Sequence, residues 1–136
     1  MNIHLTGCAT LAAFAIPAAY AQESLPPEVC SAFELYIALP ASVVPVMQGV
    51  KDRQTADAAA EALHQLMPRV YETRDAVEKI PQLSPAATQE LERRYGRKAQ
   101  TAWGPVYQEI FRLQKNQCFG STALAREFNI LCMLLK

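Results

Sequence analysis

The longest regular pattern in this sequence is an apolar repeat between residues 56 and 80. Small and apolar residues recur there at alternating spacings of three and four: Ala56, Ala59, Leu63, Leu66, Val70, Thr73, Val77 and Ile80. This spacing places them on one face of an α-helix, which then needs neighbouring helices to cover it. Thr55 is expected to cap the start of this helix. Pro68 lies on the outer face, where we expect it to kink the helix without ending it.

Two further amphipathic helices are predicted after this one. Ser84 followed by Pro85 is a strong helix start, because the serine side chain caps the first turn and proline suits the first helical position. The helix that follows is expected to bend near residues 101–105, at a Gly-Pro pair. A last helix is expected to start with Ser121 as its cap, and its inner face is formed by Leu124, Phe128, Leu131 and Leu135.

Residues 26–50 are the most apolar part of the chain after its first segment. No charged residue lies between Leu35 and Met47, so a membrane span and a central helix are both open interpretations. Pro40 and Pro45 interrupt this run, which is short for a span, and we therefore favour a central helix that the prolines kink or split. Since strand and hairpin signals are missing, the sequence predicts an all-α fold, a small antiparallel bundle of about four helices.

The first 21 residues have the composition of a signal peptide. They contain no Asp, Glu, Lys or Arg, and an apolar stretch precedes the small residues Ala19 and Ala21. Signal peptidase accepts small residues at the first and third positions before its cut. The sequence therefore predicts export to the periplasm or beyond, with residues 1–21 removed and residues 22–136 forming a single domain. A buried N-terminal helix and a lipoprotein processed at Cys8 are the alternatives.

The charge balance argues against a nucleic-acid partner. The chain has 13 Lys+Arg and 13 Asp+Glu, whereas proteins that bind nucleic acid through its phosphates carry a positive excess. One basic cluster comprises Arg93, Arg94, Arg97 and Lys98. It could bind an anionic surface, but nearby glutamates favour an ordinary solvated helix face.

Few residues could support catalysis or hold a metal. One of the two histidines lies in the leader, which leaves His64 for the mature domain. Glu61 and His64 form one Glu-x-x-His pair, whereas a di-iron bundle needs two such pairs. His64 also lies one position off the apolar face, so we expect it to face water. The sequence therefore predicts no catalytic, cofactor-binding or metal-ligating residue, and an enzyme is the least favoured class.

The cysteines suggest one disulfide. An exported chain meets an oxidising compartment, and Cys30, Cys118 and Cys132 allow at most one bridge within it. An up-down bundle places Cys30 and Cys118 at opposite ends, while the last helix returns toward Cys30. We therefore predict a Cys30–Cys132 disulfide, unless the proline kinks bring Cys118 closer to Cys30 than Cys132 is. Reduced thiols acting as small apolar groups are the alternative.

Two features suggest how a non-enzymatic helical protein could act. The tail Ile130–Leu135 is apolar on both sides, which is typical of an interface with a protein partner or a second copy. An interaction or structural module is therefore the leading hypothesis. The alternative is a binder of a small apolar ligand in the bundle core, whose pocket aromatics are Tyr36, Trp103, Tyr107 and Phe111.

Three short motifs resemble a group of small, uncharacterised, secreted helical proteins of bacteria. They are the junction Lys51-Asp52-Arg53-Gln54-Thr55-Ala56, the helix start Leu83-Ser84-Pro85 and the turn Phe119-Gly120-Ser121. The resemblance extends over most of the mature chain. It implies a helical fold and export, and it implies no activity, cofactor or site residue.

Overall fold

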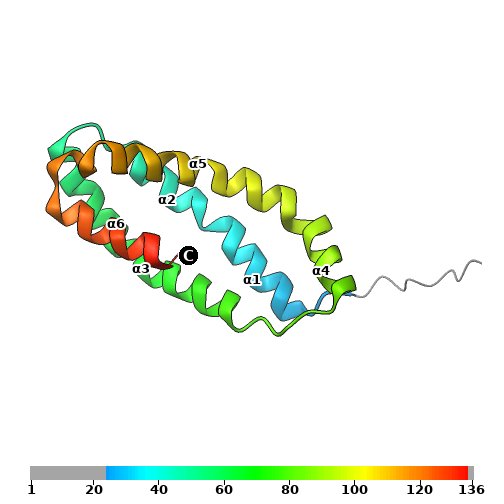
Figure 1. Cartoon of the computed structure of the whole chain (residues 1–136). Helices are drawn as coiled ribbons and strands as arrows, with labels where there is room; N and C mark the ends of the chain where they lie inside the picture. The colour runs from blue at the N-terminus through cyan, green and yellow to red at the C-terminus, as the bar shows by residue number, and fades with distance from the viewer. Residues whose placement is uncertain (1–23, 135–136) are drawn as a thin grey trace, which may run out of the picture.

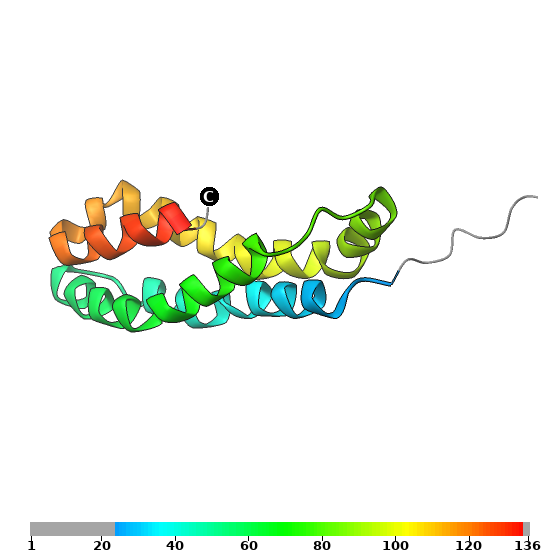
Figure 2. The same cartoon turned by 90° about the horizontal axis from the view of Figure 1, so that it is seen from below.

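The computed structural model describes residues 24–134, which form a bundle of four helical segments (Figure 1, Figure 2). In chain order the elements are α1 (Pro27–Ala38), α2 (Pro40–Gln48), α3 (Arg53–Glu78), α4 (Pro85–Leu91), the π-helical turn η1 (Glu92–Gly96), α5 (Arg97–Lys115), the 3-10 turn η2 (Gln117–Gly120) and α6 (Thr122–Leu134). No β-strand occurs in this part of the chain, so the predicted all-α bundle is confirmed. The predicted signal peptide, residues 1–21, lies outside the described residues.

The first segment joins α1 and α2 almost in line. Leu39 between them also has helical backbone angles, and the two helices meet at a bend of 13°. The bend lies at Pro40, which has no N–H to donate to the carbonyl of Tyr36 four residues earlier. The predicted proline kink is therefore confirmed, and it leaves one backbone carbonyl without its helical donor.

The joined helix α1–α2 is also the most apolar element of the described chain. Over Pro27–Gln48 its mean hydropathy reaches 1.7, and it is long enough to cross a membrane by length and composition. In this structure it packs against α3 and α5 along its length. Its apolar residues thus contribute to the contacts between helices.

A reciprocal capping box starts α3. Asp52 Oδ1 accepts the backbone N–H of Thr55 at 2.8 Å, and Thr55 Oγ1 accepts the backbone N–H of Asp52 at 3.0 Å. The prediction of Thr55 as the cap is wrong, because Asp52 holds that position and Thr55 completes the box from inside the first turn. The helix then continues through Pro68 as predicted. Its buried face comprises Ala56, Ala59, Ala60, Leu63, Met67, Val70 and Thr73.

The third segment changes direction at η1. Ser84 caps α4 as predicted, since its Oγ accepts the N–H of Ala87 at 3.1 Å. The helix widens at η1, and α4 turns away from α5 there (Figure 1). The Gly-Pro pair at residues 104–105, where a bend was expected, lies inside α5, which continues through Pro105. Proline frees only the carbonyl of Thr101, an exposed residue, and the wider turn at η1 already supplies the change of direction.

The core is divided into two clusters of unequal size. The larger fills the half of the bundle where α2, α3, α5 and α6 run together, which we call the closed half. The smaller joins α1 to α4 and η1 in the other half, which we call the open half. Returning along α3 from η2, α6 ends near the middle of the bundle (Figure 2). The open half is therefore built from α1, the C-terminal part of α3, α4, η1 and the start of α5.

The structure does not form the predicted Cys30–Cys132 disulfide. No two cysteines among the described residues lie at disulfide distance. Cys30 lies in the open half, where its Sγ is 3.7 Å from Nη1 of Arg94, and Cys118 is buried in the closed half. The physical reason is helix length: α6 has 13 residues against 26 in α3, so it carries Cys132 back along only part of the bundle.

Candidate functional site

The proline bend positions the only tryptophan of the chain. Pro40 leaves the carbonyl of Tyr36 without a helical donor, and Trp103 Nε1 on α5 donates to that oxygen at 3.1 Å. The two rings also stack, with centroids 4.7 Å apart and planes inclined by 26°. Trp103 is consequently held between α1 and α5 with only 4% of its surface exposed.

A groove of about 490 Å³ lies beside this aromatic pair in the open half. It runs between α1, α3 and α5, and Met133 near the end of α6 also lines it. The lining residues are mostly apolar: Phe33, Tyr36, Leu39, Val70, Thr73, Arg74, Val77, Glu78, Trp103 and Met133. The groove is therefore a concave, largely hydrocarbon surface built from all four helical segments.

Polar groups on the inner walls of the groove are already engaged. The indole N–H of Trp103 donates to a backbone carbonyl, and Thr73 Oγ1 donates to the carbonyl of Arg69 at 2.8 Å. Burial, and then the neighbouring Tyr107, raise the pKa of Tyr36, so this phenol is uncharged at neutral pH. The inner walls of the groove thus carry no charge and offer few unused hydrogen-bond donors.

The charged groups of the groove lie at its rim. Arg74 Nε donates to Glu78 Oε1 at 2.6 Å, and the two side chains are 44% and 55% exposed. Within residues 24–134 the terminal Nη atoms of Arg74 donate no hydrogen bond. An arginine with an unused edge therefore lies at the rim of an apolar groove.

Two of the four predicted pocket aromatics line this groove. Tyr36 and Trp103 do so, whereas Tyr107 is 54% exposed and Phe111 is 70% exposed on the outer face of α5. Successive steps of four residues advance roughly 40° around a helix of 3.6 residues per turn, so the aromatic row drifts out of the groove. Sequence reasoning missed Phe33, although its position one turn before Tyr36 was a usable signal.

The apolar tail is divided between the core and the groove. Leu131 is buried in the larger cluster, and Ile130 packs against the same cluster from a half-buried position. Met133 is 64% exposed and lines the groove. The two-sided apolar pattern in residues 130–133 thus reflects one packed side and one side that belongs to the groove.

The remaining candidate residues lie elsewhere on the surface. His64 is 67% exposed as expected, and its Nδ1 lies 3.4 Å from Oε2 of the buried Glu127. Glu61 accepts a hydrogen bond from Gln65 instead of approaching that pair. In the described part of the chain, no group of three His, Cys, Asp or Glu side chains could hold a metal ion. In the basic cluster, Arg93 forms an ion pair with a glutamate on the preceding turn.

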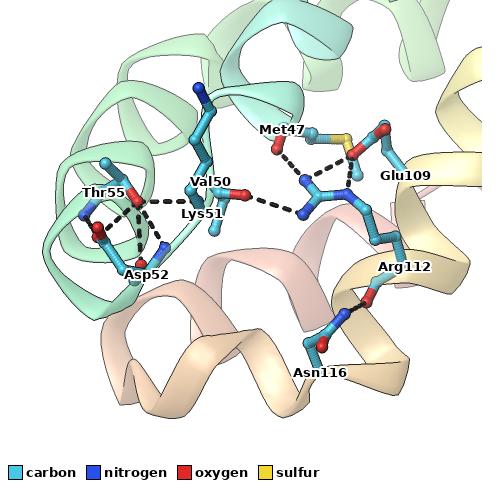
Figure 3. A network of polar contacts seen from close by, with 8 residues as sticks. All are labelled: Met47, Val50, Lys51, Asp52, Thr55, Glu109, Arg112 and Asn116. Atoms are coloured by element: carbon cyan, nitrogen blue, oxygen red, sulfur yellow. Dashed lines mark hydrogen bonds and ion pairs between the residues drawn. The ribbon is translucent and has the colours of Figure 1, made fainter.

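The junction between α2 and α3 forms a separate polar network in the closed half (Figure 3). Arg112 donates to the carbonyl oxygens of Met47 at 2.7 Å and Val50 at 2.8 Å, and its Nε donates to Glu109 at 2.7 Å. The capping box of Asp52 and Thr55 lies on the far side of the same junction (Figure 3). These groups satisfy one another, so the network holds the adjoining helix ends in place.

Comparison with known proteins does not add to this geometry. No protein-family model, no curated protein and no solved structure matches the chain.

Proposed function

We propose that this chain is an exported, non-enzymatic helical protein that binds a small apolar molecule in the groove of the open half. The observation that carries the proposal is the groove of about 490 Å³ with the stacked Tyr36 and Trp103 in its wall. Small-molecule sites typically occupy roughly 300–1,000 Å³ and are mostly apolar with a few polar groups. The groove has both properties.

The chemistry of the walls supports binding over catalysis. A catalytic centre needs a nucleophile, acid or base placed where the substrate reacts. Here the hydroxyl of Thr73 and the indole N–H of Trp103 donate to backbone carbonyls. The charged pair of Arg74 and Glu78 lies at the rim, where it would meet one end of a ligand. The body of a bound molecule would contact hydrocarbon and aromatic rings.

Trp103 supplies a direct test, because it is the single tryptophan and it lines the groove. We would titrate the protein with decanol, a neutral apolar probe, and follow tryptophan emission. Saturable quenching or a spectral shift is expected. Val77→Glu places a carboxylate on the groove wall and should weaken decanol binding by roughly tenfold or more, because ligand entry would desolvate that charge.

The matched control is Tyr71→Glu, which adds the same charge to the same helix. Tyr71 is 46% exposed and lies outside the groove lining, so decanol binding should not change. Far-UV circular dichroism would check that both variants remain helical. The proposal fails if decanol produces no saturable change, or if the two variants weaken its binding equally.

A second candidate, a module that binds a protein partner or a second copy, is favoured by two exposed aromatics on α5. Phe111 is 70% exposed and Tyr107 is 54% exposed, and neither is covered by another helix in the described structure. Sedimentation velocity over a range of concentrations would test self-association, with Phe111→Ser expected to reduce it. A monodisperse monomer at every concentration would argue against association between copies.

The proposal also includes export of the protein and the place of α1–α2 as a helix of the bundle. The uncharged leader, with Ala19 and Ala21 before the expected cut, supports removal of residues 1–21. Contacts of α1–α2 with α3 and α5 support a bundle helix over a membrane span. The intact mass of the exported protein, with and without reductant, would report the cleavage site, any disulfide and any attached lipid. A mass that still includes residues 1–21 would contradict cleavage at this site.

A further inference from the structure

We infer that the ligand of the groove is an amphipathic carboxylate, whose apolar body lies along Tyr36 and Trp103 and whose carboxylate binds the guanidinium of Arg74. This inference rests on the proposed function, because it names the ligand class for the same groove. Its basis is the distribution of polar groups between the walls and the rim.

The walls select an apolar body. Trp103 Nε1 and Thr73 Oγ1 each donate to a backbone carbonyl, and the other wall residues include Leu39 and Val70. A ligand with hydrogen-bonding groups along its body would lose water without gaining partners, which is unfavourable. A single polar group at one end avoids that loss, provided that it reaches the rim.

The rim offers a donor edge of suitable geometry. Glu78 Oε1 engages Nε of Arg74 at 2.6 Å and so fixes one edge of the planar guanidinium. The Nη atoms at its other edge donate no hydrogen bond within the described residues. Two parallel N–H groups on a planar fork match the two oxygens of a carboxylate. Arg74 can therefore bind a second carboxylate while it keeps the first.

The same geometry disfavours a cationic head group. An ammonium group could pair with Glu78 only through Oε2, since Oε1 already accepts from Arg74, and the guanidinium charge beside that carboxylate would repel the ammonium. A carboxylate uses N–H groups that are unoccupied by described residues, so no bond needs to break. The charge of Glu78 opposes the incoming carboxylate, and the expected preference over a neutral head group is therefore modest.

A matched series of ligands tests the head group. Decanoate, decanol and decylamine share one apolar chain, and their affinities at neutral pH would be measured by tryptophan emission and by calorimetry. Decanoate should bind roughly tenfold more tightly than decanol. Arg74→Gln should abolish the preference for decanoate over decanol.

Arg69→Gln is the matched control. Arg69 lies on the same helix, donates from Nη1 to Ser42 Oγ at 2.8 Å, and is outside the groove lining. This variant removes the same charge and should retain the preference for decanoate. Equal binding of decanoate and decanol to the unmodified protein would overturn the inference while leaving the proposed function intact. Tighter binding of decylamine, or an undiminished preference in Arg74→Gln, would overturn it equally. Failure of decanol itself to bind would instead contradict the proposed function.

Discussion

The two halves of the molecule bury the apolar faces of their helices in different ways. In the closed half, α2, α3, α5 and α6 surround a large core, and Arg112 covers carbonyl oxygens at the end of α2. In the open half, a smaller cluster holds α1 against α4 and η1, and a groove of about 490 Å³ remains between the helices. At the α2–α3 junction of the closed half the polar groups bond to one another, whereas in the open half one edge of Arg74 donates no hydrogen bond to a described residue.

We infer from this difference that one part of the bundle determines its stability and another part its binding of a ligand. The closed half contains most of the fully buried side chains, among them Met47, Leu63 and Leu113. The charged rim lies in the open half, and the aromatic pair lies where the two halves meet, because Trp103 belongs to the larger core cluster. Substitutions in the closed half should therefore change unfolding, and substitutions in the groove should change binding. The following predictions test this separation in order of decreasing effect.

The largest contrast is expected between two truncations on α3. Leu63 is 1% exposed in the larger core, so Leu63→Ala should lower the free energy of unfolding by about 3 kcal/mol. Val77 is half-buried at the groove, and Val77→Ala should lower it by less than about 1 kcal/mol. Urea unfolding followed by circular dichroism measures both. Decanol affinity should change only in the Val77 variant, and equal stability losses would contradict the separation of the halves.

Loss of the Arg112 side chain should also destabilise the closed half. Arg112→Met removes the donors to Met47 and Val50, which leaves the Val50 carbonyl without a partner and the Met47 carbonyl with backbone N–H donors alone, for an expected loss of about 2 kcal/mol in unfolding free energy. Lys115→Met changes an exposed cation of the same helix and should cost much less. Decanol binding by the folded Arg112 variant should not change. Similar unfolding curves for the two variants would show that the network does not hold this junction.

A smaller effect is expected where the halves meet, at the bond between Trp103 and the carbonyl of Tyr36. Trp103→Phe removes the indole donor and should cost about 1–2 kcal/mol in unfolding free energy. In a Pro40→Ala background the new backbone N–H can serve the same carbonyl, so the cost of Trp103→Phe should be smaller. A double-mutant cycle by urea unfolding measures this coupling. Strictly additive effects would refute the role assigned to Pro40.

The smallest effect concerns acid and the capping box. Hydrogen bonds from Thr55, first of all from its backbone N–H, hold the pKa of Asp52 below its ordinary value. Folding therefore favours the charged carboxylate, and its contribution is present at neutral pH. That contribution is lost as pH falls from the unfolded-state pKa of about 3.9 through the lower folded-state pKa. Asp52→Asn keeps an acceptor oxygen but does not titrate.

Thermal unfolding of the two proteins at neutral and acid pH would measure this effect. The midpoint of the unmodified protein should exceed that of Asp52→Asn at neutral pH, and the difference should narrow in acid. A difference that stays constant from neutral to strongly acid pH would contradict the lowered pKa of Asp52.

Periodicity was sufficient to predict the helices, because one apolar face must be covered whatever the neighbours are. It identified Leu63 and Val70 as core residues, and the serine before Pro85 as a cap. It did not locate the bend at η1, since a π-helical turn depends on which face of each helix finds a partner. The cap at Asp52 was missed because both members of a capping box have cap-forming side chains.

The groove was harder to predict than the helices. Tyr36 and Trp103 were identified by type, but their contact depends on a carbonyl that Pro40 frees on another helix. Met133 lines the groove because α6 ends near the middle of the bundle, and helix length relative to its partner is a tertiary property. The same property moved Cys132 away from the position that a full-length fourth helix would give it.

Cys30 and Cys118 lie in different halves of the molecule, so the rate at which a reagent labels each thiol reports on its own half. A thiol reagent modifies a protected cysteine only when the surrounding structure opens, so its rate reports how often that opening occurs. Burial raises the pKa of the Cys118 thiol, which further slows its reaction in the closed half. Cys30 is half-buried beside Arg94, so its labelling rate would report the local accessibility of the other half. With each labelled cysteine identified by peptide mass, the ratio of the rates at Cys118 and Cys30 would compare the protection of the two halves.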